Sequence, residues 1–223
     1  SGTLALMQQH LTENGYNPSP ALLKALLING ARSSGTVYGY QIDPLINYQG
    51  WGLPNLNNSM PQSFLETEGN RTSSVQFFDQ DPERAIATSD SVSWNLNIST
   101  NGARAFPLRV SLVWTDPPGN PAAGVKLVND LDLVVSNAVS GEVFYGNDFT
   151  EVSQFTRMSP SNSVPISDVV NNVENVYING PLTTNYVVSV IGRRVNVNTV
   201  FGHPDGVVQD FALVISSGDD SEL

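Results

Sequence analysis

Strict alternation of apolar and polar residues is the feature that most constrains the fold of this chain. Apolar residues occupy every second position over residues 92–98 and again over residues 108–114. Successive side chains of a strand point to opposite faces, so this period predicts strands with one face in a core. Further strand-like runs, separated by Gly, Pro and Asn turn signals, cover residues 75–78, 131–135, 142–145, 173–178, 186–191 and 211–215. The sequence therefore predicts a mainly β fold, with an eight-stranded jelly-roll β-sandwich over residues 60–223.

The first thirty residues show a helical pattern instead. Apolar residues recur at helical spacing at Leu4, Met7 and Leu11, and again at Leu22, Leu23, Leu26 and Leu27. For the second helix, Ser19 is a suitable N-cap, Pro20 suits the first helical position, and Gly30 is placed to end it. Residues 1–59 are therefore predicted to form a separate unit with two helices. Their apolar surfaces need a larger partner surface, which this chain does not obviously contain, so we expect a companion polypeptide.

Composition limits the possible partners. Of the 223 residues, 40% are hydrophobic and only 14% are charged, which favours a packed core over disorder. Lys and Arg number 10 against 21 Asp and Glu, for a formal charge of −11. This charge argues against nucleic acid and anionic membranes, because both are bound through cationic patches. The absence of Cys excludes disulfides and thiolate metal sites, and no apolar run approaches the ~20 residues of a membrane span.

The most suggestive local motif is a pair of aspartates, Asp130 and Asp132, at the start of a predicted strand. Residues two apart in a strand share a face, and two carboxylates so close raise each other's pKa unless a cation compensates. Similarly polar, turn-flanked settings hold Asp116, Asn147, Asp148, Asn172 and Glu174. Such oxygen ligands favour a hard cation, and Ca²⁺ is the predicted cofactor. The alternative is that Asp130 only begins the strand and Asp132 faces water.

Other acidic and aromatic residues have simpler interpretations. Asp79 and Asp81 could bind calcium, but such a cluster is more often a solvated turn. Trp51 lies between two glycines, and a packing or hinge role is expected there. Trp94 and Trp114 lie in the apolar phase of their strands and are predicted to be in the core.

The chain offers no catalytic residues of its own for a serine hydrolase. A Ser-His-Asp mechanism needs three side chains within hydrogen-bonding reach. The only histidines are His10, near the end of the first predicted helix, and His203, in a turn-like Gly202-His203-Pro204 stretch. No Gly-x-Ser-x-Gly elbow provides a nucleophile beside either of them. No catalytic residue is therefore predicted within this sequence.

Several segments resemble those of one enzyme family. Residues 17–31 resemble the late helix of subtilisin-like serine proteases, and Gly50-Trp51-Gly52 resembles the turn that closes their catalytic domain. The family type that it resembles is the bacterial, oxidatively stable alkaline subtilase with a C-terminal β-barrel. Segments similar to runs in those barrels cover residues 111–119, 127–135, 146–149 and 171–176. The segments occur in order along nearly the whole chain.

The resemblance implies the C-terminal part of a secreted serine endopeptidase, extracellular or periplasmic. Its partners would be an upstream catalytic domain and the protein or peptide substrates of the parent, with no nucleic acid and no membrane. Ser1-Gly2-Thr3 is not followed by the Ser-x-Ala-x-Pro of the subtilase nucleophile. It resembles later turns of the nucleophile helix, which implies that the triad lies upstream of Ser1. The alternative function is a β-sandwich module that binds substrate or carbohydrate.

Overall fold

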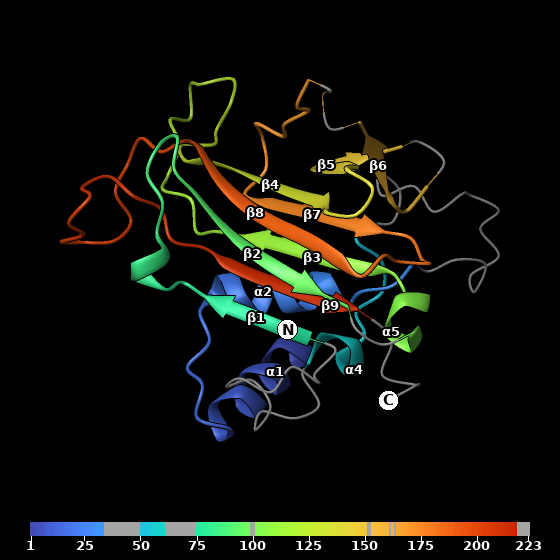
Figure 1. Ribbon diagram of the computed structural model, residues 1–223. Helices are drawn as coiled ribbons and strands as arrows, with labels where there is room; N and C mark the ends of the chain where they lie inside the picture. Colours follow the sequence, from blue (N-terminus) through green and yellow to red (C-terminus); the bar gives the residue numbers. More distant parts are fainter. Residues whose placement is uncertain are drawn as a thin grey trace.

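A computed structural model shows two antiparallel β-sheets stacked face to face, with helices against the outer face of one sheet (Figure 1). It describes residues 1–33, 50–60, 75–98, 101–150, 153–160, 162 and 164–217. The residues after Ser217 lie outside these ranges. No helix within the described ranges combines the length and apolar character needed to cross a membrane.

The first sheet has four strands in the order β1-β9-β3-β7. Their bounds are Val75–Asp79 for β1, Ala212–Ser217 for β9, Leu108–Val113 for β3 and Val173–Ile178 for β7. Every neighbouring pair is antiparallel. The strand β9 therefore lies between two strands that precede it by about a hundred residues or more in the sequence.

The second sheet has five strands in the order β2-β8-β4-β5-β6, again all antiparallel. Their bounds are Ser91–Asn97 for β2, Asn185–Arg194 for β8, Asp130–Asn137 for β4, Val143–Phe149 for β5 and Thr156–Ser159 for β6. The register shifts between Asp130 and Leu131, and again between Phe144 and Phe149. Both irregularities lie close to the predicted metal ligands.

The mainly β prediction is confirmed. Each of the eight predicted runs falls in or against one of the strands, and the described residues add a ninth strand, β6. The residues of β6, Thr156-Arg157-Met158-Ser159, lack the apolar alternation that reveals a strand. The specific jelly-roll connection and the domain division between residues 59 and 60 stay predictions.

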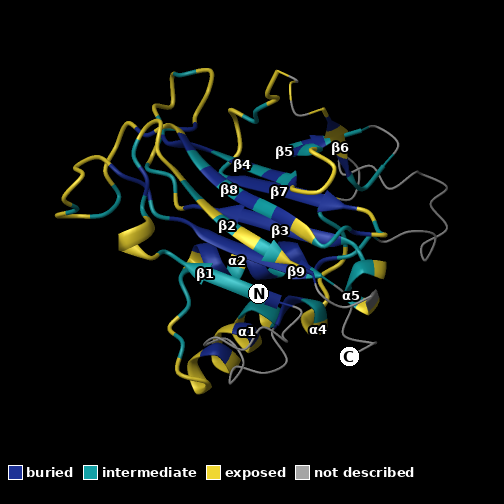
Figure 2. Ribbon diagram, viewed as in Figure 1, coloured by how far each residue is buried: buried dark blue, intermediate teal, exposed yellow. Residues whose placement is uncertain are grey.

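The main core lies between the sheets. Alternate residues of the central strands point into it, among them Val110, Leu112 and Leu213, which are all fully buried. The intervening positions Val113 and Val214 face the opposite side and are also buried. Buried residues accordingly run along β3, β7 and most of β9, whereas β1 is largely half-buried and exposed residues are found in the loops and along β2 (Figure 2). This sheet is therefore covered on both faces.

Helices supply the second cover. Helix α1 spans Gly2–Glu13 and α2 spans Pro20–Gly30, and α2 lies against β3 and β9 (Figure 1). The predicted cap of α2 is confirmed, since Ser19 Oγ accepts the backbone N–H of Leu22 at 2.9 Å. The short helices α4 (Leu56–Ser59) and α5 (Asn101–Ala105) and the 3-10 turn η2 (Pro82–Arg84) complete the helical elements of the described residues.

The expectation that the helices need a companion polypeptide is wrong for most of their apolar surface. Met7, Leu11, Leu22 and Leu26 are buried within this chain, in a cluster with the outer face of the four-stranded sheet. That face was not recognised because its positions in β3 include the polar residues Arg109 and Ser111, whose alternation with core residues resembles a water-facing side. Leu6 is the exception, with 56% of its surface exposed.

A buried polar network, here called the helix-anchoring network, joins α2 to this sheet; it consists of Asn29, Arg109, Ser111 and Ser216. Asn29 Nδ2 donates to Arg109 O and Ser111 Oγ at 3.2 Å each, and its Oδ1 accepts from Ser216 Oγ at 2.6 Å. Arg109 donates to Asn29 O at 3.0 Å and Ala31 O at 2.9 Å. These carbonyls lie at the C-terminal end of α2, where a cation also suits the helix dipole.

The Gly50-Trp51-Gly52 turn packs against the same region. Trp51 contacts Phe149 and Tyr177 edge-on, with ring centroids 5.9 and 6.2 Å apart. Gly52 has φ +102°, and a Cβ there would lie 2.1 Å from Arg32 O, so the close pairing of this turn with the residues after α2 requires glycine. The expected packing role of Trp51 is thereby confirmed.

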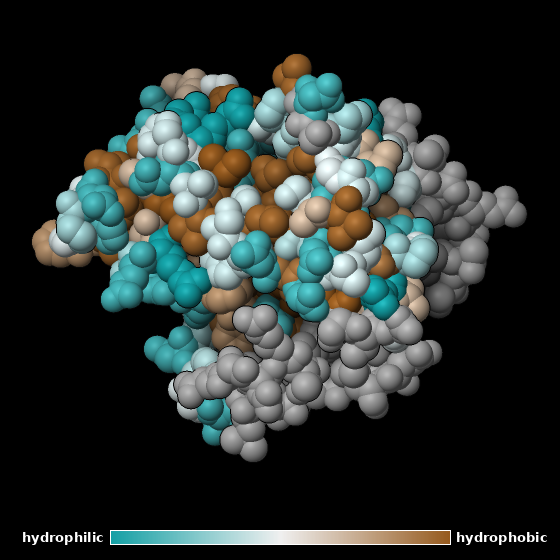
Figure 3. All heavy atoms as spheres, viewed as in Figure 1, coloured by the Kyte–Doolittle hydropathy of each residue, from teal (hydrophilic) through white to brown (hydrophobic). Residues whose placement is uncertain are grey.

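The other two tryptophans also pack as predicted. Trp114 is 1% exposed, and its indole N–H donates to Asn129 O at 2.9 Å. Trp94 is half-buried and packs against the inter-sheet core beside Phe78 and Phe211. On the face shown in Figure 3, hydrophobic residues are interspersed with hydrophilic ones.

Candidate functional site

Three of the predicted metal ligands meet at one corner of the sandwich and are here called the carboxylate cluster: Asp130, Asp132 and Glu174. Asp130 and Asp132 come from β4 in the five-stranded sheet, and Glu174 comes from β7 in the other sheet. Asp130 and Glu174 are each only 1% exposed. Asp130 and Glu174 are therefore enclosed, whereas Asp132 is half-buried.

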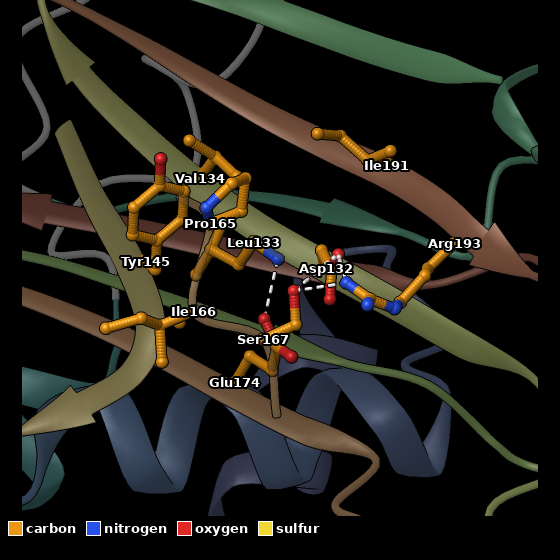
Figure 4. Close-up of a pocket in the computed structure, with 11 residues that line it drawn as sticks. Asp132, Leu133, Val134, Tyr145, Pro165, Ile166, Ser167, Glu174, Ile191 and Arg193 are labelled. Carbon is orange, nitrogen blue, oxygen red and sulfur yellow. Dashed lines mark hydrogen bonds and ion pairs between the residues drawn. The ribbon is translucent and has the colours of Figure 1, made fainter. Parts of the chain in front are cut away.

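Glu174 connects the layers directly. Its Oε2 accepts the backbone N–H of Leu133 in β4 at 2.6 Å (Figure 4). The pairing of β4 with β5 runs only from Val134 to Ser136, so the carboxylate takes the N–H just beyond the point where this pairing stops. A Cβ on Gly146 of β5 would lie 2.1 Å from Glu174 Oε2, so glycine is needed to admit this side chain.

An arginine faces the two aspartates. Arg193 Nη1 lies 3.2 Å from Asp132 Oδ2, and Arg193 Nε lies 3.9 Å from Asp130 Oδ2. Ser167 Oγ donates to Asp132 Oδ2 at 3.1 Å and accepts a short hydrogen bond from Arg193 Nη1. Asp130 and Asp132 therefore lie together as predicted, but the cation that the structure places beside them is a guanidinium.

Each carboxylate of the cluster keeps one buried oxygen without a hydrogen-bond partner in the structure: Asp130 Oδ1, Asp132 Oδ1 and Glu174 Oε1. Burial raises the pKa of Glu174 well above its usual range; the Leu133 N–H lowers it in part, and Asp132, Asp168 and Asp130 raise it further. Burial also raises the pKa of Asp130, with a further contribution from Asp132. The cluster is thus short of compensating donors.

A pocket of about 320 Å³ opens beside the cluster. Its polar lining is Asp132, Ser167, Glu174 and Arg193. Its remaining lining is Leu133, Val134, Tyr145, Gly146, Pro165, Ile166 and Ile191. Tyr145, Pro165 and Ile166 lie on one side in Figure 4, and Asp132 and Arg193 lie on the other. The pocket is therefore apolar along one wall and acidic at its inner end, where Glu174 is buried.

Asn147 joins this region indirectly. Its Nδ2 donates to Asp168 Oδ2 at 2.6 Å and to Val173 O at 2.7 Å, and its Oδ1 accepts from Asn175 N at 3.0 Å. Asn147 has φ +59° and lies within β5, at its register shift. Asn147 and Asp148 therefore lie within an irregular strand.

The other predicted ligands are engaged elsewhere. Asp116 accepts the backbone N–H groups of Val128 at 2.9 Å and Asn129 at 2.7 Å, and so holds the loop before β4. Asp148 Oδ1 lies 3.7 Å from Arg157 Nε, while its Oδ2 is buried without a partner. Asn172 Nδ2 donates to Trp114 O at 2.9 Å. These contacts link none of the three to the carboxylate cluster.

The metal hypothesis finds limited support in this geometry. Among the described residues, no group of three or more Asp, Glu, His or Cys side chains is arranged to hold a metal ion. The carboxylate oxygens are of the type that Ca²⁺ takes, but Arg193 already lies against both aspartates. Calcium binding at the seven predicted residues stays a prediction.

The secondary candidates have local structural partners. Asp79 accepts from Ser19 N at 2.8 Å and from Ser19 Oγ in a short hydrogen bond, which holds the start of α2. Asp81 pairs with Arg84 at 3.2 Å. His203 Nδ1 lies 3.7 Å from Asp205 Oδ2 within its own turn. His10 lies in the last turn of α1.

Three members of this site were not predicted from the sequence: Ser167, Asp168 and Arg193. Ser167 and Asp168 belong to a stretch whose pattern matched neither helix nor strand. Arg193 is the penultimate residue of β8 and lies at the register shift with β4, where Arg194 pairs with Asp130 and Gly192 pairs with Leu131. Charge complementarity with the Asp130/Asp132 pair was the one available signal, since the chain has only 10 basic residues.

Comparison with known proteins gives an independent indication of function. No protein-family model matches the chain. It is similar to three Dictyostelium discoideum proteins named serine protease/ABC transporter B family protein: tagB at 28% identity, tagA at 30% and tagD at 29%. The matches cover 85%, 81% and 79% of this chain.

The chain spans only about a tenth of those relatives, namely 11% of tagB, 9% of tagA and 11% of tagD. It is therefore similar to one serine protease-related region of much longer proteins. The more specific resemblance to bacterial alkaline subtilases stays a prediction.

Proposed function

We propose that this chain is the C-terminal, non-catalytic segment of a secreted subtilisin-like serine endopeptidase, in which the β-sandwich stabilises the protease region. The observation that carries the proposal is the similarity over 79–85% of the chain to proteins named as serine proteases. The subtilase-like segments over residues 17–31 and 50–56 support the C-terminal assignment, because they resemble the late helix and the closing turn of a subtilase catalytic domain.

The packing of α2 supports a stabilising role. The helix-anchoring network ties the end of this subtilase-like helix to β3 and β9 of the sandwich. Trp51, in the subtilase-like turn, packs on Phe149 and Tyr177 from the same sandwich. Elements attributed to the protease and elements of the sandwich thus share buried contacts, so the loss of one would destabilise the other.

The placement of the histidines supports a non-catalytic role for this segment. His10 is exposed on α1, and His203 contacts Asp205 two residues away in an exposed loop. The contact of His203 with Asp205 pairs the imidazole with a carboxylate and not with a serine nucleophile. Peptide-bond hydrolysis, with an acyl-serine intermediate, would belong to residues outside this chain.

Fluorophosphonate labelling of a preparation that contains this segment with its proposed protease region tests the assignment. Mass spectrometry should locate the modified serine outside residues 1–223. A label within these residues would overturn the non-catalytic role. A preparation that hydrolyses peptides but takes no label anywhere would contradict the serine protease assignment itself.

The stabilising role has a separate test in the same preparation. Arg109→Met should lower the temperature at which labelling is lost on heating, because it removes the anchor of α2. Arg84→Met is the matched control, since that arginine is exposed and pairs only with Asp81 and nearby aromatic rings. Equal heat sensitivity of the two variants would argue against the proposed role of the sandwich.

A further inference from the structure

The pocket beside the carboxylate cluster has the features of a built binding site rather than a packing defect. Its volume of about 320 Å³ lies at the lower end of the range of roughly 300–1,000 Å³ for ligand pockets. Glu174 lines it, is 1% exposed, and keeps Oε1 without any partner. A buried carboxylate oxygen left unpaired is costly, and such groups call for a specific explanation.

The charged residues around the pocket favour a positively charged ligand. Asp132 and Glu174 line it, and Asp130 and Asp168 lie near enough to act on Glu174 electrostatically. Two arginines, Arg193 and Arg194, lie near enough to Asp130 to oppose this negative charge. Of the two arginines, Arg193 is already engaged with Asp130, Asp132 and Ser167. An additional positive group would therefore be bound favourably.

The apolar lining of the pocket favours an organic cation over a metal ion. Most of it is apolar, and Tyr145, Pro165 and Ile166 form a wall leading to the acidic end (Figure 4). A hydrated metal ion gains nothing from such a wall. An alkyl chain gains from the apolar wall, and an ammonium group at its end is attracted by the carboxylates of Asp132 and Glu174.

We infer that this pocket binds an alkylammonium group of the kind that a lysine side chain carries, with the stem along Tyr145, Pro165 and Ile166 and the ammonium at Glu174 and Asp132. The ligand would be a lysine of a peptide segment or a free amine, which share this chemistry. This inference goes beyond the proposed stabilising function and does not depend on it.

Calorimetric titration of the folded chain with Nα-acetyl-lysine N-methylamide tests the inference. Its neutral counterpart, Nα-acetyl-norleucine N-methylamide, has the same stem without the ammonium. The lysine compound should bind at least tenfold more tightly and shift the amide resonances of Leu133, Gly146 and Ser167. A third probe, n-pentylamine, separates the two sources, because a free-amine site would bind it as tightly as the lysine compound.

Substitution of the acidic end provides the variant test. Glu174→Gln keeps an oxygen for the Leu133 N–H but removes the charge, so it should weaken lysine binding at least tenfold and leave the norleucine compound unaffected. Glu83→Gln, at an exposed position in η2, is the charge-matched control. If Glu174→Gln does not fold, the lysine–norleucine comparison on the unaltered chain decides alone.

Three results would overturn the inference. The first is equal affinity for the lysine and norleucine compounds. The second is unchanged lysine binding in a folded Glu174→Gln variant. The third is tight binding of Ca²⁺ that depends on Glu174 and Asp132 while neither amine binds, which would instead support the calcium prediction.

Discussion

The helix-anchoring network and the carboxylate cluster are both buried polar groups between layers, but they differ in how completely they are satisfied. In the network, Asn29 uses both ends of its amide and Arg109 donates to two carbonyls. In the cluster, each of Asp130, Asp132 and Glu174 keeps a buried oxygen unpaired. A fully satisfied network rigidifies a core, whereas a partly satisfied one costs stability.

The difference also lies in charge balance. The single charge of the network, Arg109, faces helix C-terminal carbonyls and the Tyr177 ring at 3.7 Å, which are all electron-rich partners. The cluster contains three carboxylates beside one closely placed guanidinium. The first region is therefore explained by the fold alone, and the second is better explained by a ligand.

The largest expected effect comes from breaking the satisfied region. Arg109→Met should lower the free energy of unfolding by about 3 kcal/mol, because two charge-assisted hydrogen bonds and a cation–π contact are lost inside the protein. Chemical denaturation monitored by circular dichroism would measure this loss. Arg84→Met should cost less than about 1 kcal/mol, as expected for an exposed ion pair. A loss at Arg109 as small as that control would mean that the network contributes little.

A smaller effect is expected where the two sheets approach each other at the cluster. Gly146→Ala places a Cβ 2.1 Å from Glu174 Oε2 and should destabilise the protein by about 1–3 kcal/mol, the usual cost of overpacking. Gly124→Ala, which meets nothing within 4 Å, is the control and should be nearly neutral. Thermal melting of both variants measures the difference. Equal melting temperatures would show that Glu174 moves aside without cost.

The smallest expected effect is a pH dependence of stability that comes from Glu174 in the carboxylate cluster. Burial raises the pKa of Glu174 in the folded protein well above its value in the unfolded chain, with Asp132, Asp168 and Asp130 adding to the shift; Arg193 and Arg194 are the nearby cations. Between the two pKa values the folded state binds a proton that the unfolded state has lost. The contribution of Glu174 to stability therefore declines as pH rises above about 4.

Glu174→Gln removes this dependence, so the variant should gain stability relative to the unaltered chain as pH increases from about 4 toward neutrality. Urea denaturation at several pH values would measure the gain. Glu83→Gln should change the stability by the same amount at each pH. A constant difference for Glu174→Gln as well would mean that Glu174 titrates alike in the folded and unfolded chains.

Much of the fold could be predicted because its determinants are local. Alternation identified β2 and β3, and the Ser19-Pro20 cap fixed the start of α2 within the sequence itself. The partner of α2 could not be predicted in this way. The outer face of the four-stranded sheet consists of residues such as Val113 and Val214, whose shared surface depends on the strand order β9-β3.

The site was predicted only in part for a similar reason. Asp130 and Asp132 are close in sequence, so strand periodicity was enough to bring them together. Glu174 reaches them only because β7 packs across from β4 and because Gly146 leaves room. Arg193 meets them through the β4–β8 register, which is displaced at Asp130. Such contacts depend on how the strands pack in space, which the local sequence pattern of each strand does not predict.

The position of β9 has a consequence for how the chain acquires its structure. This strand, the last of the described residues, hydrogen-bonds to β1 on one side and β3 on the other. Until residues 212–217 leave the ribosome, β1 lacks its neighbour and β3 shows a bare edge, which is a template for aggregation. Closing the sheet then requires loops of about a hundred residues or more, a topology that folds slowly. We therefore expect the four-stranded sheet to close only after residues 212–217 have been synthesised.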